Sequence, residues 1–218
     1  MSRREENKEL KREKIIIAAK EIISSQGMDK LTMRYLAEKA QVSSRTPYNL
    51  FESKTDILVA IILDAAKHMQ LPAVGANNQL LLEQLIQLPD TIKQFIANDH
   101  DFYRDVIWGI MSSDTKLTRD TATTAIAGII SVLVSNAVKQ KECSDKLKVE
   151  ILSSHLITQF LAIIGMWGGS QLDLDEAVAN IQFSWTNTLL PYSTRKSKAS
   201  LNQAQQTYAQ ALEETLTN

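Results

Sequence analysis

The stretch TMRYLAEKAQVSSRTPYNLFESK, residues 32–54, decides how this chain folds at its amino-terminal end. It predicts short helices joined by a tight turn, and the helix after the turn carries almost no acidic residue. Upstream, residues 15–25 place apolar side chains at helical spacing, and Gly27 stands where a helix cap is expected. Three helices within about forty residues, with an acid-poor face, predict a small domain that lies against a polyanion.

Polar side chains around this turn are of the kind that bind DNA. Thr32 is expected to cap the second helix, whose free amides and dipole then favour a phosphate. The third helix is expected to present short donors and acceptors, one guanidinium and one phenol, which bond base edges and phosphates. These are Ser44, Arg45, Thr46, Tyr48 and Asn49. Ser53 and Asp56 form a capping-box pattern for a fourth helix, with Lys54 in its first turn, where it can reach a phosphate.

Several spacings agree at once with one known family. They are Gly27, Thr32, LAEKA at 36–40, VS at 42–43, TxYxxF at 46–51 and SK at 53–54. Over about residues 10–60 the chain resembles the DNA-binding domain of the tetracycline-repressor (TetR) family. The resemblance implies an all-α homodimer with a helix-turn-helix head and a larger ligand-binding body. Such proteins act most often as repressors that leave their operator when a small molecule binds.

The resemblance also implies roles for individual positions of the head. Five residues fall where the family contacts phosphates: Thr32, Ser43, Thr46, Tyr48 and Lys54. Four fall where it reads or borders bases: Arg34, Ser44, Arg45 and Asn49.

The head departs from the family pattern at three positions. Gln41 replaces the usual glycine of the turn, so a left-handed backbone there is more costly. Tyr35 replaces a common acid and leaves Thr32 without a capping-box partner. Pro47 cannot donate a backbone bond, so the recognition helix is expected to start late, with Arg45 on the turn.

Composition predicts an all-α fold for the whole chain. Its 218 residues are 44% hydrophobic and include 7 Gly and 4 Pro, while helix-favouring residues are common. Residues 1–56 hold 12 Lys and Arg against 9 Asp and Glu, whereas the rest hold 12 against 16, so the amino-terminal part suits phosphate better. No apolar run of about 18 residues and no signal peptide are recognised, and Cys143 is the single cysteine. We therefore expect a cytoplasmic protein without a membrane span.

Three domains are expected: a DNA-binding domain at 1–56, a helical effector-binding and dimerisation domain at 57–192, and an extra amphipathic helix or tail at 193–218. Helices at about 145–168 and 173–190 occupy the dimer-forming positions of the family. Both keep apolar residues over more than one stripe, as expected if each packs on its own body and on a partner. Packing within one monomer is the alternative. The tail either docks on the body or the other subunit, or stays loosely ordered.

Large apolar residues of the body are candidates for lining an effector cavity, although the same spacing is typical of a core. They are Phe102, Tyr103, Trp108, Met111, Phe160, Met166, Trp167 and Trp185. No buried basic cluster indicates an anionic ligand, so an apolar or weakly polar effector is expected. No cofactor is expected. No metal is expected either, because the consecutive residues Asp99, His100 and Asp101 cannot all face one ion.

The resulting hypothesis is a homodimeric transcriptional regulator on a palindromic double-stranded DNA operator, and the family resemblance favours a repressor. One alternative is a protein-interaction module whose head no longer reads DNA. Another is an all-α enzyme, which the lack of a nucleophile–base pair, an HExxH motif or a glycine-rich phosphate loop disfavours. The basic residues of the leading segment either enter a minor groove or belong to a frayed, solvated helix start. These are Arg3, Arg4, Lys8, Lys11, Arg12 and Lys14.

Overall fold

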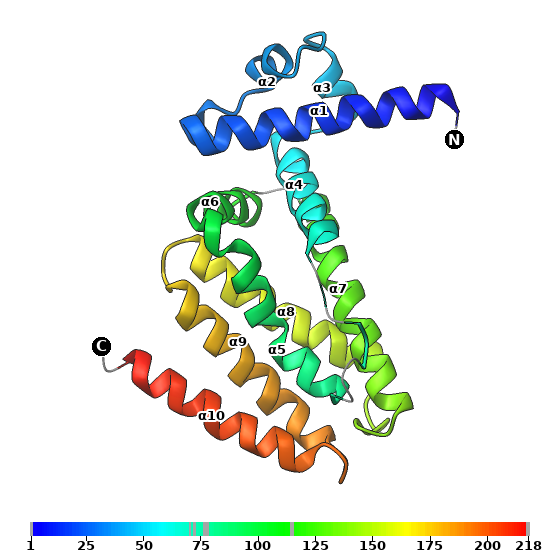
Figure 1. Ribbon diagram of the computed structural model, residues 1–218, viewed down its shortest axis with the longest axis vertical. Helices are drawn as coiled ribbons and strands as arrows, with labels where there is room; N and C mark the ends of the chain where they lie inside the picture. Colours follow the sequence, from blue (N-terminus) through cyan, green and yellow to red (C-terminus); the bar gives the residue numbers. More distant parts are fainter. Residues whose placement is uncertain (1, 70, 72, 76–78, 114–115, 217–218) are drawn as a thin grey trace. The chain divides into compact units, whose positions relative to one another are not determined.

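The computed structural model describes residues 2–69, 71, 73–75, 79–113 and 116–216. Helices dominate the described chain, which confirms the predicted all-α class; one isolated antiparallel bridge joins Cys143 and Ser193. The chain divides into two compact units (Figure 1). Unit 1 holds residues 1–68 and 99–122, and unit 2 holds residues 69–98 and 123–218.

Unit 1 contains the predicted head together with two further helices. Its elements are α1 (Arg3–Gln26), η1 (Met28–Lys30), α2 (Met33–Lys39), α3 (Thr46–Leu50), α4 (Lys54–His68) and α6 (His100–Met111). α1 begins well before the apolar stripe because Ser2 caps it: the Glu5 amide donates to Ser2 Oγ at 3.3 Å, and the Ser2 amide donates to Glu5 Oε2 at 2.7 Å. It ends at Gly27, whose φ of 84° only glycine adopts without strain.

The core of unit 1 runs from the head into α4 and α6. Ile15 and Ile22 of α1 pack with Leu36 of α2 and with the buried face of α4. Val106 and Ile110 of α6 belong to the same cluster. The expected head boundary at residue 56 therefore falls inside a continuous core rather than between two cores.

An ion pair fastens α4 to α1. Lys20 Nζ lies 2.7 Å from Asp64 Oδ2, and both side chains are about two thirds covered. The hydrogen bond from Lys20 lowers the pKa of Asp64, with burial acting in the opposite direction. The charged carboxylate is therefore the form that favours the folded state.

Replacing Asp64 by Asn should lower the free energy of unfolding by roughly 0.5–1 kcal/mol near neutral pH. Because the folded-state pKa of Asp64 is lowered, its contribution is complete above the unfolded-state pKa and is lost as the pH falls through the folded-state pKa. Urea unfolding of wild type and D64N across acidic and neutral pH should show two curves that converge in acid. A constant gap would mean that Asp64 acts through packing.

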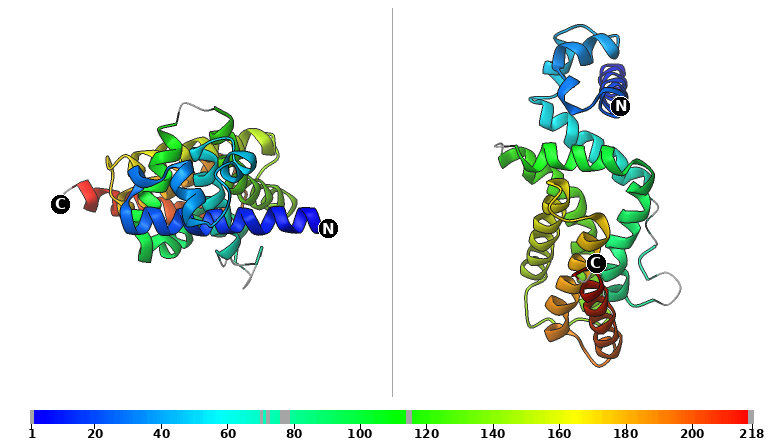
Figure 2. Two further views of the ribbon diagram at one scale, coloured as in Figure 1. Left: turned by 90° about the horizontal axis from the view of Figure 1, so that it is seen from above. Right: turned by 90° about the vertical axis from the view of Figure 1, so that its left-hand side faces the viewer.

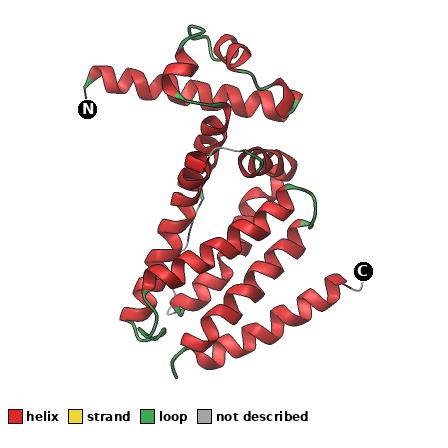
Figure 3. Cartoon of the chain, turned by 180° about the vertical axis from the view of Figure 1, so that it is seen from behind, coloured by secondary structure: helices red, strands yellow, loops and turns green. Residues whose placement is uncertain are grey.

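Unit 2 is a layered bundle in which α9 holds the central place. It contains α5 (Leu81–Ile96), α8 (Val149–Gly168), α9 (Leu174–Leu189), η4 (Leu190–Tyr192) and α10 (Lys198–Leu216). α7 (Lys116–Lys139) and η3 (Ala97–Asp99) run across the division between the units. α9 packs against α5, α8 and α10, and it lies between the last two (Figures 1 and 3).

The carboxy-terminal segment is a helix that docks on its own body. Leu201 of α10 is fully buried, Gln205 Nε2 donates to Asn187 Oδ1 at 2.5 Å, and Ser200 donates to Glu83. On the opposite side, α10 exposes mainly amide and carboxylate side chains. Of the alternatives for residues 193–218, docking on the body is the one observed.

This docking bears on the expected dimer surface, which stays a prediction. The sequence predicts that the helix at 173–190 turns an apolar face toward a partner, but Asp175 is the one exposed residue of α9. α10 packs along α9. An apolar helix face indicates that another element covers it, but it does not identify that element. The sequence therefore did not distinguish a partner helix from α10.

α8 keeps an exposed stripe with apolar residues at both ends and two polar ones between them. It consists of Ile151, His155, Thr158, Ala162 and Met166, which follow one another at helical spacing. Ile151 is 53% exposed and Met166 is 42% exposed. Among the described residues, α8 is also the one helix long and apolar enough to cross a membrane. Core helices of other proteins meet the same criterion. Of the most apolar stretch of α8, 33% is buried.

Candidate nucleic-acid interface

Thr32 caps α2 as predicted. Its Oγ1 accepts from the Tyr35 amide at 3.2 Å, and its backbone is extended. Tyr35, which stands in place of a capping-box acid, instead accepts a 2.8 Å bond from Gln26 Nε2 at the end of α1. The amino-terminal end of α2 is therefore capped, tied to α1 and free of negative charge.

The turn after α2 adopts the left-handed backbone although glycine is missing. Gln41 has a φ of 54°, and its side chain is exposed, so no core packing opposes this conformation. The amide of Val42 donates to Ala37 O at 3.0 Å and closes the turn. The cost of a non-glycine residue there is on the order of 1 kcal/mol.

The recognition helix α3 starts late, as Pro47 predicted. Arg45 is its N-cap and lies on the turn. Pro47 belongs to the first turn of the helix, where a missing backbone N–H costs little because that N–H would have no helical partner. The hydroxyls of Ser43 and Thr46 lie 2.8 Å apart and bridge the turn to the helix. The result is a short helix over Thr46–Leu50.

Most of the predicted DNA residues are exposed around this short helix. Tyr48 is 63% exposed, an unusual state for an aromatic residue of a packed head. The other exposed positions are Thr32, Arg34, Ser43, Ser44, Arg45 and Asn49, while Thr46 is half-buried. The structure thus gathers hydroxyl, amide and guanidinium groups on one surface. Such groups bind phosphates and base edges.

Lys54 differs from the other predicted contacts. Its Nζ donates to Met28 O at 2.8 Å, and burial lowers the pKa of Lys54 while Asp29 partly restores it. One of its three protons therefore holds η1 against α4, and two are left for a phosphate.

α1 is fixed against the end of the recognition helix. Arg12 Nη1 donates to Leu50 O at 3.0 Å, and its guanidinium lies 4.3 Å from the centre of the Phe51 ring. A charged group stacked on an aromatic face and bonded to a backbone carbonyl holds α1 beside α3.

The capped α2, the turn and the exposed α3 define a helix-turn-helix DNA-binding domain. Residues 15–61 match the family model described as bacterial regulatory proteins, tetR family. The amino-terminal domain of the chain is thus of the TetR type. Comparison with curated protein sequences found no match.

Solved structures show that the similarity of fold extends through the body. FadR of Thermus thermophilus, a TetR-family repressor solved with lauroyl-CoA, has a TM-score of 0.65 at 17% identity, over 84% of this chain and 97% of its own. TylP of Streptomyces fradiae has a TM-score of 0.61 at 16% identity, over 99% and 94%. SmeT, repressor of a multidrug efflux pump of Stenotrophomonas maltophilia, has a TM-score of 0.60 at 16% identity, over 84% and 91%.

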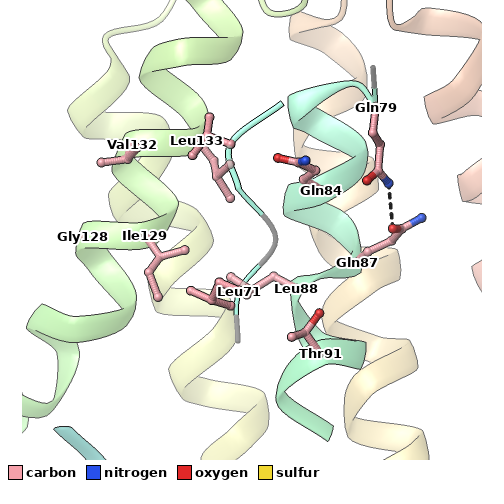
Figure 4. Close-up of a pocket in the computed structure, with 11 residues that line it drawn as sticks. Leu71, Gln79, Gln84, Gln87, Leu88, Thr91, Gly128, Ile129, Val132 and Leu133 are labelled. Atoms are coloured by element: carbon pink, nitrogen blue, oxygen red, sulfur yellow. Dashed lines mark hydrogen bonds between the residues drawn. The ribbon is translucent and has the colours of Figure 1, made fainter. Parts of the chain in front are cut away.

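Unit 2 holds an apolar cavity of about 310 Å³ between α5 and α7 (Figure 4). Its apolar wall is formed by Leu71, Val74, Leu88, Ile129, Val132 and Leu133. The polar groups are uncharged: Gln79 donates to Gln87 at 2.8 Å, and Thr91 and Gln84 complete the lining. Gln84 accepts from the Gly75 amide at 3.1 Å and donates to Ala73 O at 3.2 Å, so it pins a loop at the cavity edge.

None of the eight predicted ligand residues lines this cavity, and the structure divides them between the units. Phe102, Tyr103, Trp108 and Met111 belong to α6 in unit 1. There, Trp108 is 48% exposed and borders a second cavity of about 540 Å³ beside Met28 and Lys54.

The other four lie on α8 and α9 in unit 2. Trp167 and Trp185 are core residues, and Trp185 Nε1 donates to Leu156 O at 2.9 Å. Phe160 packs against Trp185, with ring centres 6.2 Å apart, whereas Met166 is exposed. Size and apolarity did not point to the glutamines of α5. An amide recurring among buried apolar positions, as at Gln84, was the sequence signal for this cavity.

Proposed function

We propose that this protein is a homodimeric repressor that binds a palindromic operator and releases it when a small apolar or weakly polar molecule occupies the α5–α7 cavity. The observation that carries the proposal is the exposed segment from Ser43 to Asn49, held rigid by the Ser43–Thr46 bridge, Pro47 and the Arg12 anchor. An exposed tyrosine on an acid-free helix, with an exposed guanidinium on the turn before it, suits the major groove.

The dimer is proposed to form through α8. Its exposed stripe combines apolar ends at Ile151 and Met166 with small side chains at Thr158 and Ala162, which lets two helices approach closely. α9 lies covered beneath α10 and contributes no face of its own. A twofold dimer places two heads on two half-sites, which is why a palindromic operator is expected.

The nature of the cavity supports a neutral effector. Its lining carries amide and hydroxyl groups but no charged side chain. Burying a charged ligand group against such a wall would leave the charge unpaired, at a cost of several kcal/mol. FadR of Thermus thermophilus is a relative in fold whose structure holds lauroyl-CoA, which bears an acyl chain. An apolar molecule with one or two uncharged hydrogen-bonding groups fits best.

Selection of sites from random DNA duplexes by the full-length protein tests the proposal. We expect one enriched palindrome and an affinity that falls steeply with salt. The selected duplex then serves to screen neutral amphiphiles for release. Recovery of no enriched sequence would exclude the repressor function and favour a protein-interaction role for the head.

On the selected operator, Asn49→Ala and Arg45→Ala should each lose about 1–3 kcal/mol of preference at particular base pairs. Lys54→Ala, in contrast, should weaken all sequences alike, because it contacts phosphate and η1 rather than bases. Affinities measured against a panel of single base-pair variants separate the two behaviours. Equal losses on every sequence for all three variants would refute base reading by Asn49 and Arg45.

A further inference from the structure

The first turns of α1 extend beyond the part of the helix that packs into the core. Residues 3–11 are all exposed, and in Figures 1 and 2 this end of α1 continues past α2 and α3. The Ser2–Glu5 capping box and the Arg12 anchor hold it as a helix at both ends. It is therefore a fixed helical extension of unit 1, neither a frayed start nor an extended arm.

Charges that alternate in the sequence separate on the surface of this helix. Arg4, Lys8 and Lys11 continue, at steps of four and three residues, the stripe that Ile15, Ala18 and Ile22 bury in the core. The basic residues therefore point to the same side as the core-facing stripe. The acids Glu6, Glu9 and Glu13 follow one another at similar steps on the opposite side.

The basic side forms one wall of a groove, and the recognition helix forms the other. An open groove of about 870 Å³ is lined by Arg3, Arg4, Lys8 and Lys11 of α1 and by Thr46 and Asn49 of α3. A second hollow of about 330 Å³ continues it past Lys11 and Lys14 to the turn at Gln41–Ser43. Lys11 and Thr46 border both. The groove thus runs along the edge of the DNA-reading surface.

The cations in this groove have no protein anion to neutralise them. Among the described residues, Arg3, Arg4, Lys8 and Lys11 form no ion pair within 4.0 Å and no side-chain hydrogen bond. The one acid in the groove lining, Glu5, bonds the Ser2 amide rather than a cation; the hydrogen bonds with Ser2 lower the pKa of Glu5, so it stays charged at the end of the row. A row of unpaired cations along one side of a fixed helix suits a nucleic-acid backbone.

We propose that Arg4, Lys8 and Lys11 bind backbone phosphates flanking the operator, so that α1 is a second DNA-binding element beside α3. This inference rests on the proposed function. It assigns the extension a sequence-independent role, because long basic side chains on a fixed helix contact phosphates without reading base edges.

The test compares three full-length triple variants by fluorescence-anisotropy titration of the selected operator across a range of salt concentrations. R4Q/K8Q/K11Q removes the basic stripe, and E6Q/E9Q/E13Q alters the opposite side of the same helix. K139Q/K146Q/K148Q removes three exposed cations from unit 2 and controls for net charge. Each variant is also titrated with a non-specific duplex and with operators that carry short or long flanks.

For R4Q/K8Q/K11Q we expect the slope of log affinity against log salt to fall by about 0.9 for each phosphate that the variant no longer neutralises, or roughly 2.7 per subunit. The preference for operator over non-specific DNA should stay unchanged, and longer flanks should strengthen wild type but not this variant. The other two variants should keep the wild-type slope. A slope equal to that of K139Q/K146Q/K148Q would overturn the inference. Because phosphate binding is independent of sequence, the non-specific duplex tests α1 even if site selection recovers no operator.

Discussion

Ala162→Glu should convert the proposed dimer to a monomer and reduce operator affinity by roughly 100-fold or more. Ala162 lies within the exposed stripe on α8, between Thr158 and Met166. In a twofold dimer two carboxylates would be brought together and desolvated, at a cost of several kcal/mol. Each head would then bind its half-site alone and lose the effective concentration that a linked second head supplies, a factor of about 10²–10⁴. Analytical ultracentrifugation and operator titration measure the two effects.

A matched variant separates the interface from a general effect of added charge. Gln206→Glu places the same carboxylate on the exposed polar side of α10 and should leave both dimer and affinity intact. Because Ala162 is exposed, its replacement should not disturb the core of the subunit. The Ala162→Glu monomer should therefore still unfold in one cooperative transition. A variant that stays dimeric would remove α8 from the interface. The exposed stripe of α8 would then need another explanation, and partitioning onto lipid vesicles would test the membrane alternative.

The head was predictable from the sequence because its signals are local. A cap such as Thr32, a proline such as Pro47 and a capping box such as Ser53–Asp56 act over three or four residues, so spacing alone fixes them. The late start of α3 and the place of Arg45 on the turn followed from Pro47. The charge separation along α1 was equally present in the sequence, but it appears only when residues 4–13 are known to be helical.

The arrangement of the body was less predictable because it depends on contacts between distant segments. α9 was predicted as a helix with more than one covered face. Its neighbour α10 lies in residues 193–218, for which the sequence left both a docked amphipathic helix and a loose tail open. The cavity depends on Gln84, on the loop that it pins and on α7, which only the fold brings together. Trp167 and Trp185, two of the residues expected to line a cavity, fill the core of unit 2.

Glu142 gives the clearest case of such a distant contact, and its replacement should have the largest effect on stability. Its side chain is 1% exposed in the segment after α7, and Oε2 accepts from the Leu82 amide at 3.2 Å. α5 has no side-chain cap of its own at Leu80, so the Glu142 carboxylate caps its amino-terminal end and adds a negative charge to that of Glu83 in the first turn. Oε1 lies 3.3 Å from Lys196 Nζ, and the Glu142 backbone carbonyl accepts from Ser197 Oγ at 2.6 Å. One residue therefore joins α5, the end of α7 and the start of α10.

Glu142→Ala should lower the free energy of unfolding of unit 2 by about 3 kcal/mol, because it leaves the buried Leu82 amide without its acceptor and removes the ion pair with Lys196. Glu142→Gln keeps one acceptor for Leu82 and should lose about half as much. Unfolding followed by tryptophan fluorescence in a Trp108→Phe background reports on unit 2 alone, because Trp167 and Trp185 both lie there. Lys146→Ala, an exposed change in the same segment, is the control. If both Glu142 variants are as stable as wild type, the contacts of α10 with α9 and α5 are enough to hold it. Proteolysis between residues 193 and 197 should then remain as slow as in wild type.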